Sequence, residues 1–100
     1  MTAELVFIAL LVHLLYDFHW QGEYVRIGKE KSVGLLFVHA LTWGMLMTSV
    51  LYLFGIYAVW KIAFLIATHF VIDWITVQKR LIPRWLDQAL HLVTIALVLY

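Results

Sequence analysis

The sequence predicts an all-α integral membrane protein, a four-helix bundle whose helices run up and down. Of its 100 residues, 65% are hydrophobic and 13% are charged, whereas soluble domains are about 45–50% apolar and about 25% charged. The apolar residues fall into four segments close to the length of about 20 residues that a helix needs to cross a bilayer. Short polar connections separate these segments, and short connections join antiparallel neighbours in a bundle.

The four predicted spans make up a single transmembrane domain over residues 1–100. They cover approximately residues 3–20, 33–54, 57–77 and 83–100, with a polar connection, a turn at Gly55 and a basic connection between them. Ser32 is a suitable N-cap for the second span, and Pro83 suits the start of the fourth. The first span lacks the basic region and the small-residue cleavage site of a signal peptide, so we expect it to remain in the mature protein.

The lysine and arginine residues predict the orientation. Six of the seven lie at the first and third connections, and only Lys61 lies near the opposite side. Because basic residues in short loops stay in the cytoplasm, both termini are predicted to be extracytoplasmic, in a multi-pass protein of the cell inner (plasma) membrane. The lipid bilayer is then the main partner, with a homo-oligomer left open. No basic run points to nucleic acid. The six residues are Arg26, Lys29, Lys31, Lys79, Arg80 and Arg84.

Histidine and aspartate residues are the most informative feature inside the spans. Each aspartate is four residues from a histidine, a spacing that puts both side chains on one helix face. Ionisable groups inside a bilayer are costly and normally face the bundle interior. On the predicted topology all seven groups lie in the cytoplasmic half, where they can converge on one site. They are His13 with Asp17, His69 with Asp73, Asp87 with His91, and the unpaired His39.

Two of these pairs lie in segments that resemble each other. The segment 13–18 (HLLYDF) is similar to the segment 69–74 (HFVIDW), and each is followed by a histidine one helix later. The two halves of the chain would run in the same direction, as in a parallel repeat related by an axis along the membrane normal. This similarity favours a pseudo-symmetric site between the two halves.

Imidazole and carboxylate together favour zinc, iron or manganese. All seven groups are therefore candidate ligands of a divalent ion, or of two ions that share a carboxylate. Gln21 and Gln88 are candidates for binding a cofactor or substrate, although helix capping or contact with headgroups would also explain them. Two other interpretations remain open. The groups could be interhelical hydrogen-bond contacts, or a proton relay, although no comparable polar set continues the path through the outer half.

The histidines and aspartates stand in four short motifs, which are, in order, His13-x-x-x-Asp17-Phe18-x-x-Gln21, His39-Ala40, His69-Phe70-x-x-Asp73 and Asp87-Gln88-x-x-His91. The chain is similar to the uncharacterised bacterial or phage-borne membrane proteins grouped as domain of unknown function 3307. Tyr16 departs from the small residue expected before Asp17. The resemblance implies a polytopic membrane protein and supplies no activity.

The function predicted from these residues is a metal-dependent hydrolase that acts on an amphiphilic substrate at the cytoplasmic interface. A metal ion lowers the pKa of a bound water to about 7 and makes it a nucleophile. Asp17, Asp73 and Asp87 would serve as ligands, orienting groups or general base. The similarity to membrane-bound metal-dependent hydrolases is limited to this use of histidine and aspartate. The alternatives are a small metal-ion or proton transporter, and a structural membrane protein with polar interhelical contacts only.

Overall fold

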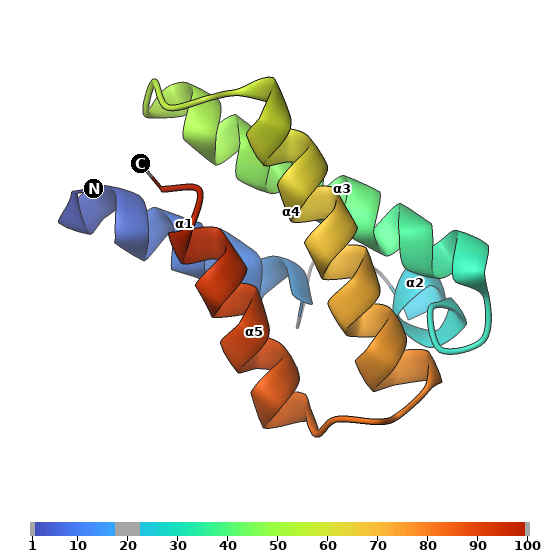
Figure 1. Ribbon diagram of the computed structural model, residues 1–100. Helices are drawn as coiled ribbons and strands as arrows, with labels where there is room; N and C mark the ends of the chain where they lie inside the picture. The colour runs from blue at the N-terminus through green and yellow to red at the C-terminus, as the bar shows by residue number, and fades with distance from the viewer. Residues whose placement is uncertain (1, 18–22, 100) are drawn as a thin grey trace.

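The computed structural model describes residues 2–17 and 23–99, and these residues form helices and connections without any strand. The prediction of an all-α protein is thereby confirmed. A π-helical segment, η2 (Trp74–Gln78), continues the fourth helix without a break. The helices are α1 (Ala3–Leu15), α2 (Glu23–Gly28), α3 (Val33–Leu53), α4 (Val59–Asp73) and α5 (Arg84–Ala96) (Figure 1).

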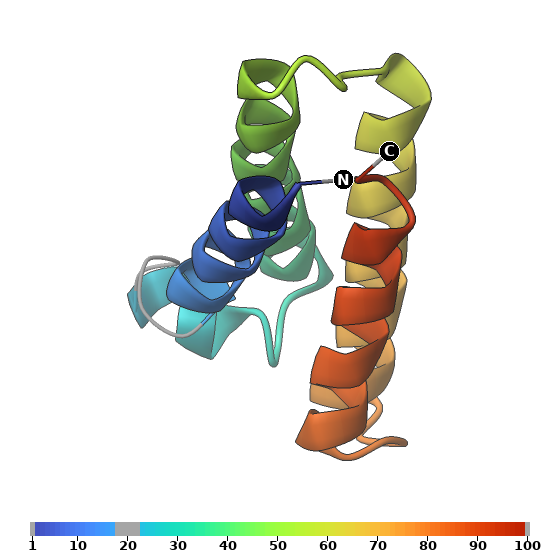
Figure 2. The same ribbon diagram turned by 90° about the vertical axis from the view of Figure 1, so that its left-hand side faces the viewer.

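The four longer helices lie side by side. Helices α3 and α4 form a central antiparallel hairpin, α1 packs against α3, and α5 packs against α4 (Figures 1 and 2). Side chains of α1 and α5 complete the ring, since His13 is hydrogen-bonded to Gln88. Consecutive long helices therefore run in opposite directions. Both termini lie on the side of the turn between α3 and α4, and α2 lies toward the other end (Figure 2).

Local sequence signals explain where the helices begin. The Thr2 hydroxyl accepts a hydrogen bond from the Leu5 amide (3.1 Å) at the start of α1. The Ser32 hydroxyl accepts one from the Leu35 amide (3.2 Å), so the prediction that Ser32 caps the second span is confirmed. Such caps satisfy amides that have no partner within the helix.

The helix lengths differ from the predicted spans. Residues 33–53 and 59–78 are each long and apolar enough to cross a membrane. Helices α1 and α5 have only 13 residues each, or about 20 Å at 1.5 Å per residue. Residues 18–20 of the first predicted span lie outside the described part. Helix α2 was not predicted, because a six-residue helix in a polar stretch gives almost no periodic signal.

The interior is divided along the bundle axis. An apolar core fills the half toward the termini, and the buried histidines and aspartates fill the other half. Trp43, fully buried on α3, lies between the two halves. Helices α3 and α4 approach closely at Gly44, where a Cβ atom would collide with the Ile66 side chain. The apolar core includes Leu5, Ala9, Met47, Val50, Leu51, Leu65, Ile95, Val98 and Leu99.

Candidate metal centre

The fold brings all seven predicted histidine and aspartate side chains into one buried cluster, here called the His/Asp cluster. None of the seven is more than 4% exposed. These side chains come from all four long helices. They converge because each side chain lies on the inward face of its helix and at a similar depth in the bundle. The contributions are His13 from α1 and Asp17 just beyond it, His39 from α3, His69 and Asp73 from α4, and Asp87 and His91 from α5.

Asp73 is at the centre of the cluster. Its Oδ2 atom lies 3.0 Å from His39 Nε2 and 3.1 Å from His69 Nε2. Its Oδ1 atom lies 2.9 Å from His91 Nε2. The Nε2 atoms of His39 and His69 are themselves 3.0 Å apart. Ligands bonded to an ion at about 2.0–2.2 Å stand about 3–3.5 Å from one another, so these spacings match those of ligand atoms around an ion.

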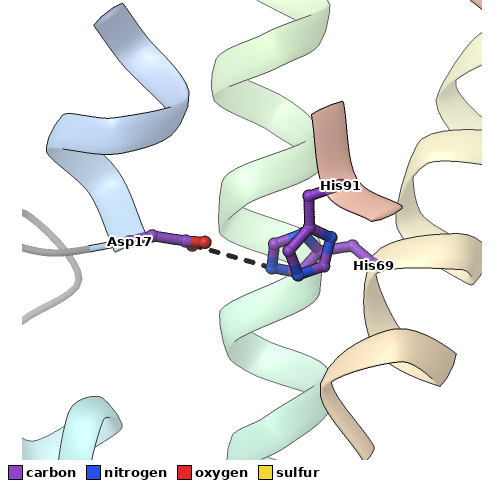
Figure 3. Close-up of side chains that lie close together, drawn as sticks. All are labelled: Asp17, His69 and His91. Atoms are coloured by element: carbon purple, nitrogen blue, oxygen red, sulfur yellow. Dashed lines mark ion pairs between the residues drawn. The ribbon is translucent and has the colours of Figure 1, made fainter. Parts of the chain in front are cut away.

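The other two aspartates flank this centre on opposite sides. Asp17 Oδ1 lies 3.3 Å from His39 Nε2 and 3.8 Å from His69 Nε2, and Figure 3 shows it facing the stacked His69 and His91 rings. Asp87 Oδ1 lies 3.4 Å from His91 Nε2. Three groups have ligating atoms that all lie within 4.8 Å of one another: Asp17, His69 and His91; His39, His69 and Asp73; and Asp73, Asp87 and His91.

His13 has a different role from the other three histidines. The Trp43 indole N–H donates to its Nδ1 atom (3.0 Å). Indole nitrogen is only a donor, so the proton of a neutral His13 ring is on Nε2, which then donates to Gln88 Oε1 (3.0 Å). Both ring nitrogens are thereby used, and none of the three groups contains His13. His13 thus links Trp43 to Gln88, and the ligand role that the sequence suggested for it stays a prediction.

Gln88 links several members of the cluster. While its carbonyl accepts from His13, its amide nitrogen lies 3.0 Å from Asp87 Oδ2 and 3.4 Å from Asp17 Oδ2. One amide therefore connects a histidine with two carboxylates from different helices. The other predicted binding residue, Gln21, lies outside the described residues.

Aromatic rings enclose the cluster on the side of the apolar core. The Trp43 ring stacks on His69 at 4.1 Å between centroids, and His69 stacks on His91 at the same distance. The Tyr16 ring stacks on His39 (5.3 Å). Sequence reasoning did not include Trp43 in the site. Its position four residues after His39, on the same helix face, was the available signal.

The backbone at two of the aspartates leaves the regular α-helical pattern. Residues 16 and 17 are π-helical, and so is η2, which begins directly after Asp73. In η2 the Lys79 amide bonds to the Trp74 carbonyl, five residues earlier (3.0 Å). Single π-helical turns inside helices are frequent at functional sites. When the segments 13–18 and 69–74 are aligned, these turns begin at different positions, at residue 16 in the first segment and at residue 74 in the second.

Several buried atoms test whether the cluster fits a metal ion. Asp73 Oδ2 makes no hydrogen bond with a described residue although two imidazole nitrogens are within 3.1 Å, so these atoms are close without being aligned with one another. The Nδ1 atoms of His39, His69 and His91 also lack a described partner. Each unpaired Nδ1 atom costs about 1–3 kcal/mol of stability. The cost of all three is smaller than the binding free energy of a structural zinc ion, which is roughly 10–16 kcal/mol. The residues therefore fit a divalent ion.

A family model described as "Protein of unknown function (DUF3307)" matches residues 5–100. No curated protein matches the chain, and no solved structure matches it.

Proposed function

The chain belongs to DUF3307, a family of proteins of unknown function, and we propose that it is a membrane-embedded metal-dependent hydrolase. In this proposal the long helices form a four-helix transmembrane bundle with the His/Asp cluster in its cytoplasmic half. The substrate is an amphiphile that presents its head group at the cytoplasmic interface. The convergence of His39, His69 and Asp73 in a buried position carries the proposal.

The distribution of side chains supports the membrane location. Large apolar side chains point outward from the long helices, among them Phe7 (66% exposed), Met45 (61%) and Val59 (72%), while charged groups are buried inside. The Cα trace extends 36 Å along its longest axis, compared with about 30 Å for the hydrocarbon core of a bilayer. The short helices α1 and α5 would be accommodated by local thinning of the bilayer or by polar residues that reach the interface.

A divalent ion would supply the nucleophile. Held by His39, His69 and Asp73, with Asp17 next to them, zinc, iron or manganese would lower the pKa of a bound water to about 7. In the hydrolysis the water oxygen bonds to the phosphorus or carbonyl carbon of the ester, and the bond to the leaving oxygen breaks. A neighbouring carboxylate such as Asp17 takes the water proton and passes it to that leaving oxygen.

A polar hollow next to the cluster supports an anionic head group as the substrate. It has a volume of about 320 Å³ and is lined by Glu30, Thr76, Val77, Arg80, Ile82 and Arg84. Thr76 donates a hydrogen bond to Asp87 Oδ1 (2.7 Å), so one side chain connects the hollow with the cluster. Arginine binds phosphate and carboxylate groups through a planar set of donors. Arg80 also has an unusual left-handed backbone (φ 55°), a conformation that clusters at functional sites.

Metal content and hydrolysis test this function directly. Protein purified in mild detergent should contain at least about one equivalent of zinc, iron or manganese, and should cleave fluorogenic phosphate-ester or carboxylic-ester amphiphiles in vesicles. His69→Ala should lose both metal and activity, because it removes a nitrogen from the centre of the cluster. Thr48→Val is the matched control, since among the described residues the Thr48 hydroxyl bonds only within α3 (2.7 Å to the Gly44 carbonyl).

Two results would contradict the proposal. Metal-free wild-type protein, or an unchanged metal content in His69→Ala, would favour polar interhelical contacts without a ligand. Metal binding with ion flux across liposomes, in the absence of hydrolysis, would favour the transporter.

The orientation of the bundle is a separate prediction. Six of the seven basic residues lie at the end of the bundle that contains the His/Asp cluster, so this end should be cytoplasmic and both termini extracytoplasmic. An alkaline phosphatase fused after Tyr100 should therefore be active, and a green fluorescent protein fused at the same place should be dark. The reverse pattern would place the cluster in the outer half of the membrane.

A further inference from the structure

We propose that the His/Asp cluster is a dinuclear centre, in which two divalent ions are bridged by the carboxylate of Asp73. This inference rests on the metal site of the proposed function and goes further by assigning a second ion and its ligands. It follows from the two oxygen atoms of Asp73, which face different sets of ligating atoms.

The first ion position is on the Oδ2 side. His39 Nε2 and His69 Nε2 lie 3.0 and 3.1 Å from this oxygen and 3.0 Å from each other. Asp17 Oδ1 is the nearest further carboxylate oxygen, 3.3 Å from His39 Nε2. The two imidazoles and the Asp73 carboxylate supply three ligands, and Asp17 lies next to the fourth position of a four-coordinate ion.

The second ion position is on the Oδ1 side. His91 Nε2 lies 2.9 Å from Asp73 Oδ1 and 3.4 Å from Asp87 Oδ1. The Asp87 carboxylate is fixed in place, because Thr76 donates to Oδ1 (2.7 Å) and Gln88 donates to Oδ2 (3.0 Å). Three protein ligands leave a coordination position for water or substrate, as in catalytic metal sites. Thr76 also lines the polar hollow, so this ion would be the closer of the two to a bound head group.

Two ions bridged by the Asp73 carboxylate fit this arrangement better than a single ion does. One ion on the Oδ2 side would leave His91 and Asp87 as hydrogen-bonding groups around Asp73. Yet the ligating atoms of Asp73, Asp87 and His91 also all lie within 4.8 Å of one another, as those of His39, His69 and Asp73 do. In two-metal hydrolytic sites the ions are about 3.5–4 Å apart and stabilise the attacking and leaving oxygens together. A shared carboxylate allows such a separation.

Manganese binding distinguishes one ion from two. Detergent-purified wild-type protein reconstituted with Mn²⁺ should bind about two equivalents and give the paramagnetic resonance spectrum of a spin-coupled pair. Asp87→Asn should bind about half as much and give the spectrum of isolated Mn²⁺, because it weakens only the second position. The asparagine oxygen can still accept the Thr76 hydrogen bond, but its NH2 group would face the Gln88 amide nitrogen, so Gln88 must turn to a new partner. Thr48→Val should match the wild type.

The outcomes separate this inference from the function on which it rests. About one equivalent in the wild type, with an uncoupled spectrum, would overturn the dinuclear centre and leave a mononuclear hydrolase. No bound manganese, zinc or iron in the wild type would overturn both. The wild-type measurement is decisive by itself if Asp87→Asn fails to fold.

Discussion

Removal of the metal is expected to lower the unfolding temperature of the wild-type protein clearly. Without an ion, Asp17, Asp73 and Asp87 form a cluster of buried carboxylates that either repel one another or must be neutralised. An ion that binds only the folded state stabilises it by RT ln(1 + [L]/Kd), about 4 kcal/mol at a thousandfold excess over Kd. Thermal unfolding in detergent, with and without a strong chelator, measures the effect.

Leucine variants provide the controls. With His13, His39, His69 and His91 all changed to leucine, the protein should ignore the chelator, because no imidazole remains to bind an ion. This variant should be less stable than the wild type, because its three aspartates stay buried without their imidazole partners. Single variants refine the comparison. His69→Leu should lose its response to chelator, whereas His13→Leu should keep it, since both His13 nitrogens are used by Trp43 and Gln88. Wild-type protein that ignores chelator would contradict the metal site.

Replacement of Trp43 should have the largest effect of any single substitution on stability. Trp43→Ala removes a fully buried ring that stacks on His69, and it removes the donor to His13. Truncation of a buried aromatic residue costs about 3–5 kcal/mol of unfolding free energy. Trp43→Phe keeps a ring but leaves His13 Nδ1 without its donor, which costs about 1–3 kcal/mol. Chemical or thermal unfolding followed by circular dichroism gives both values.

A second tryptophan serves as the matched control. Trp60 is 58% exposed near the start of α4, so Trp60→Ala should change the unfolding free energy by less than about 1 kcal/mol. Equal loss of unfolding free energy in Trp43→Ala and Trp60→Ala would contradict the prediction that the contacts of the Trp43 ring stabilise the protein.

The convergence of the His/Asp cluster could be predicted because it depends on helix geometry alone. A spacing of four keeps His69 and Asp73 on one face, and the alternating direction of the helices puts His39 and His91 at a matching depth. No knowledge of side-chain contacts was needed for this step. The distances among these residues then follow from packing, which the sequence does not express.

Other features depend on tertiary contacts and were missed for that reason. The proton position on His13 is set by the Trp43 indole, 30 positions away in the chain. Thr76 appeared in the sequence as an unremarkable polar residue, although it connects Asp87 with the polar hollow. The apolar pattern also did not predict how long α1 and α5 are or that α2 exists, since helix ends depend on caps and packing more than on hydropathy.

The apolar core between Trp43 and the turn after α3 would keep protons from crossing the bundle. Buried charged groups in a membrane protein can form a leak for protons, which would dissipate the gradient of an energised membrane. Here the apolar core fills the bundle on one side of the His/Asp cluster, with Met47, Val50 and Leu51 on α3 packed together with Leu5, Leu65 and Ile95. In the proposed transmembrane bundle, protons taken up or released by the cluster would exchange with one compartment only. A reactive site built in this way can work inside the bilayer without discharging it.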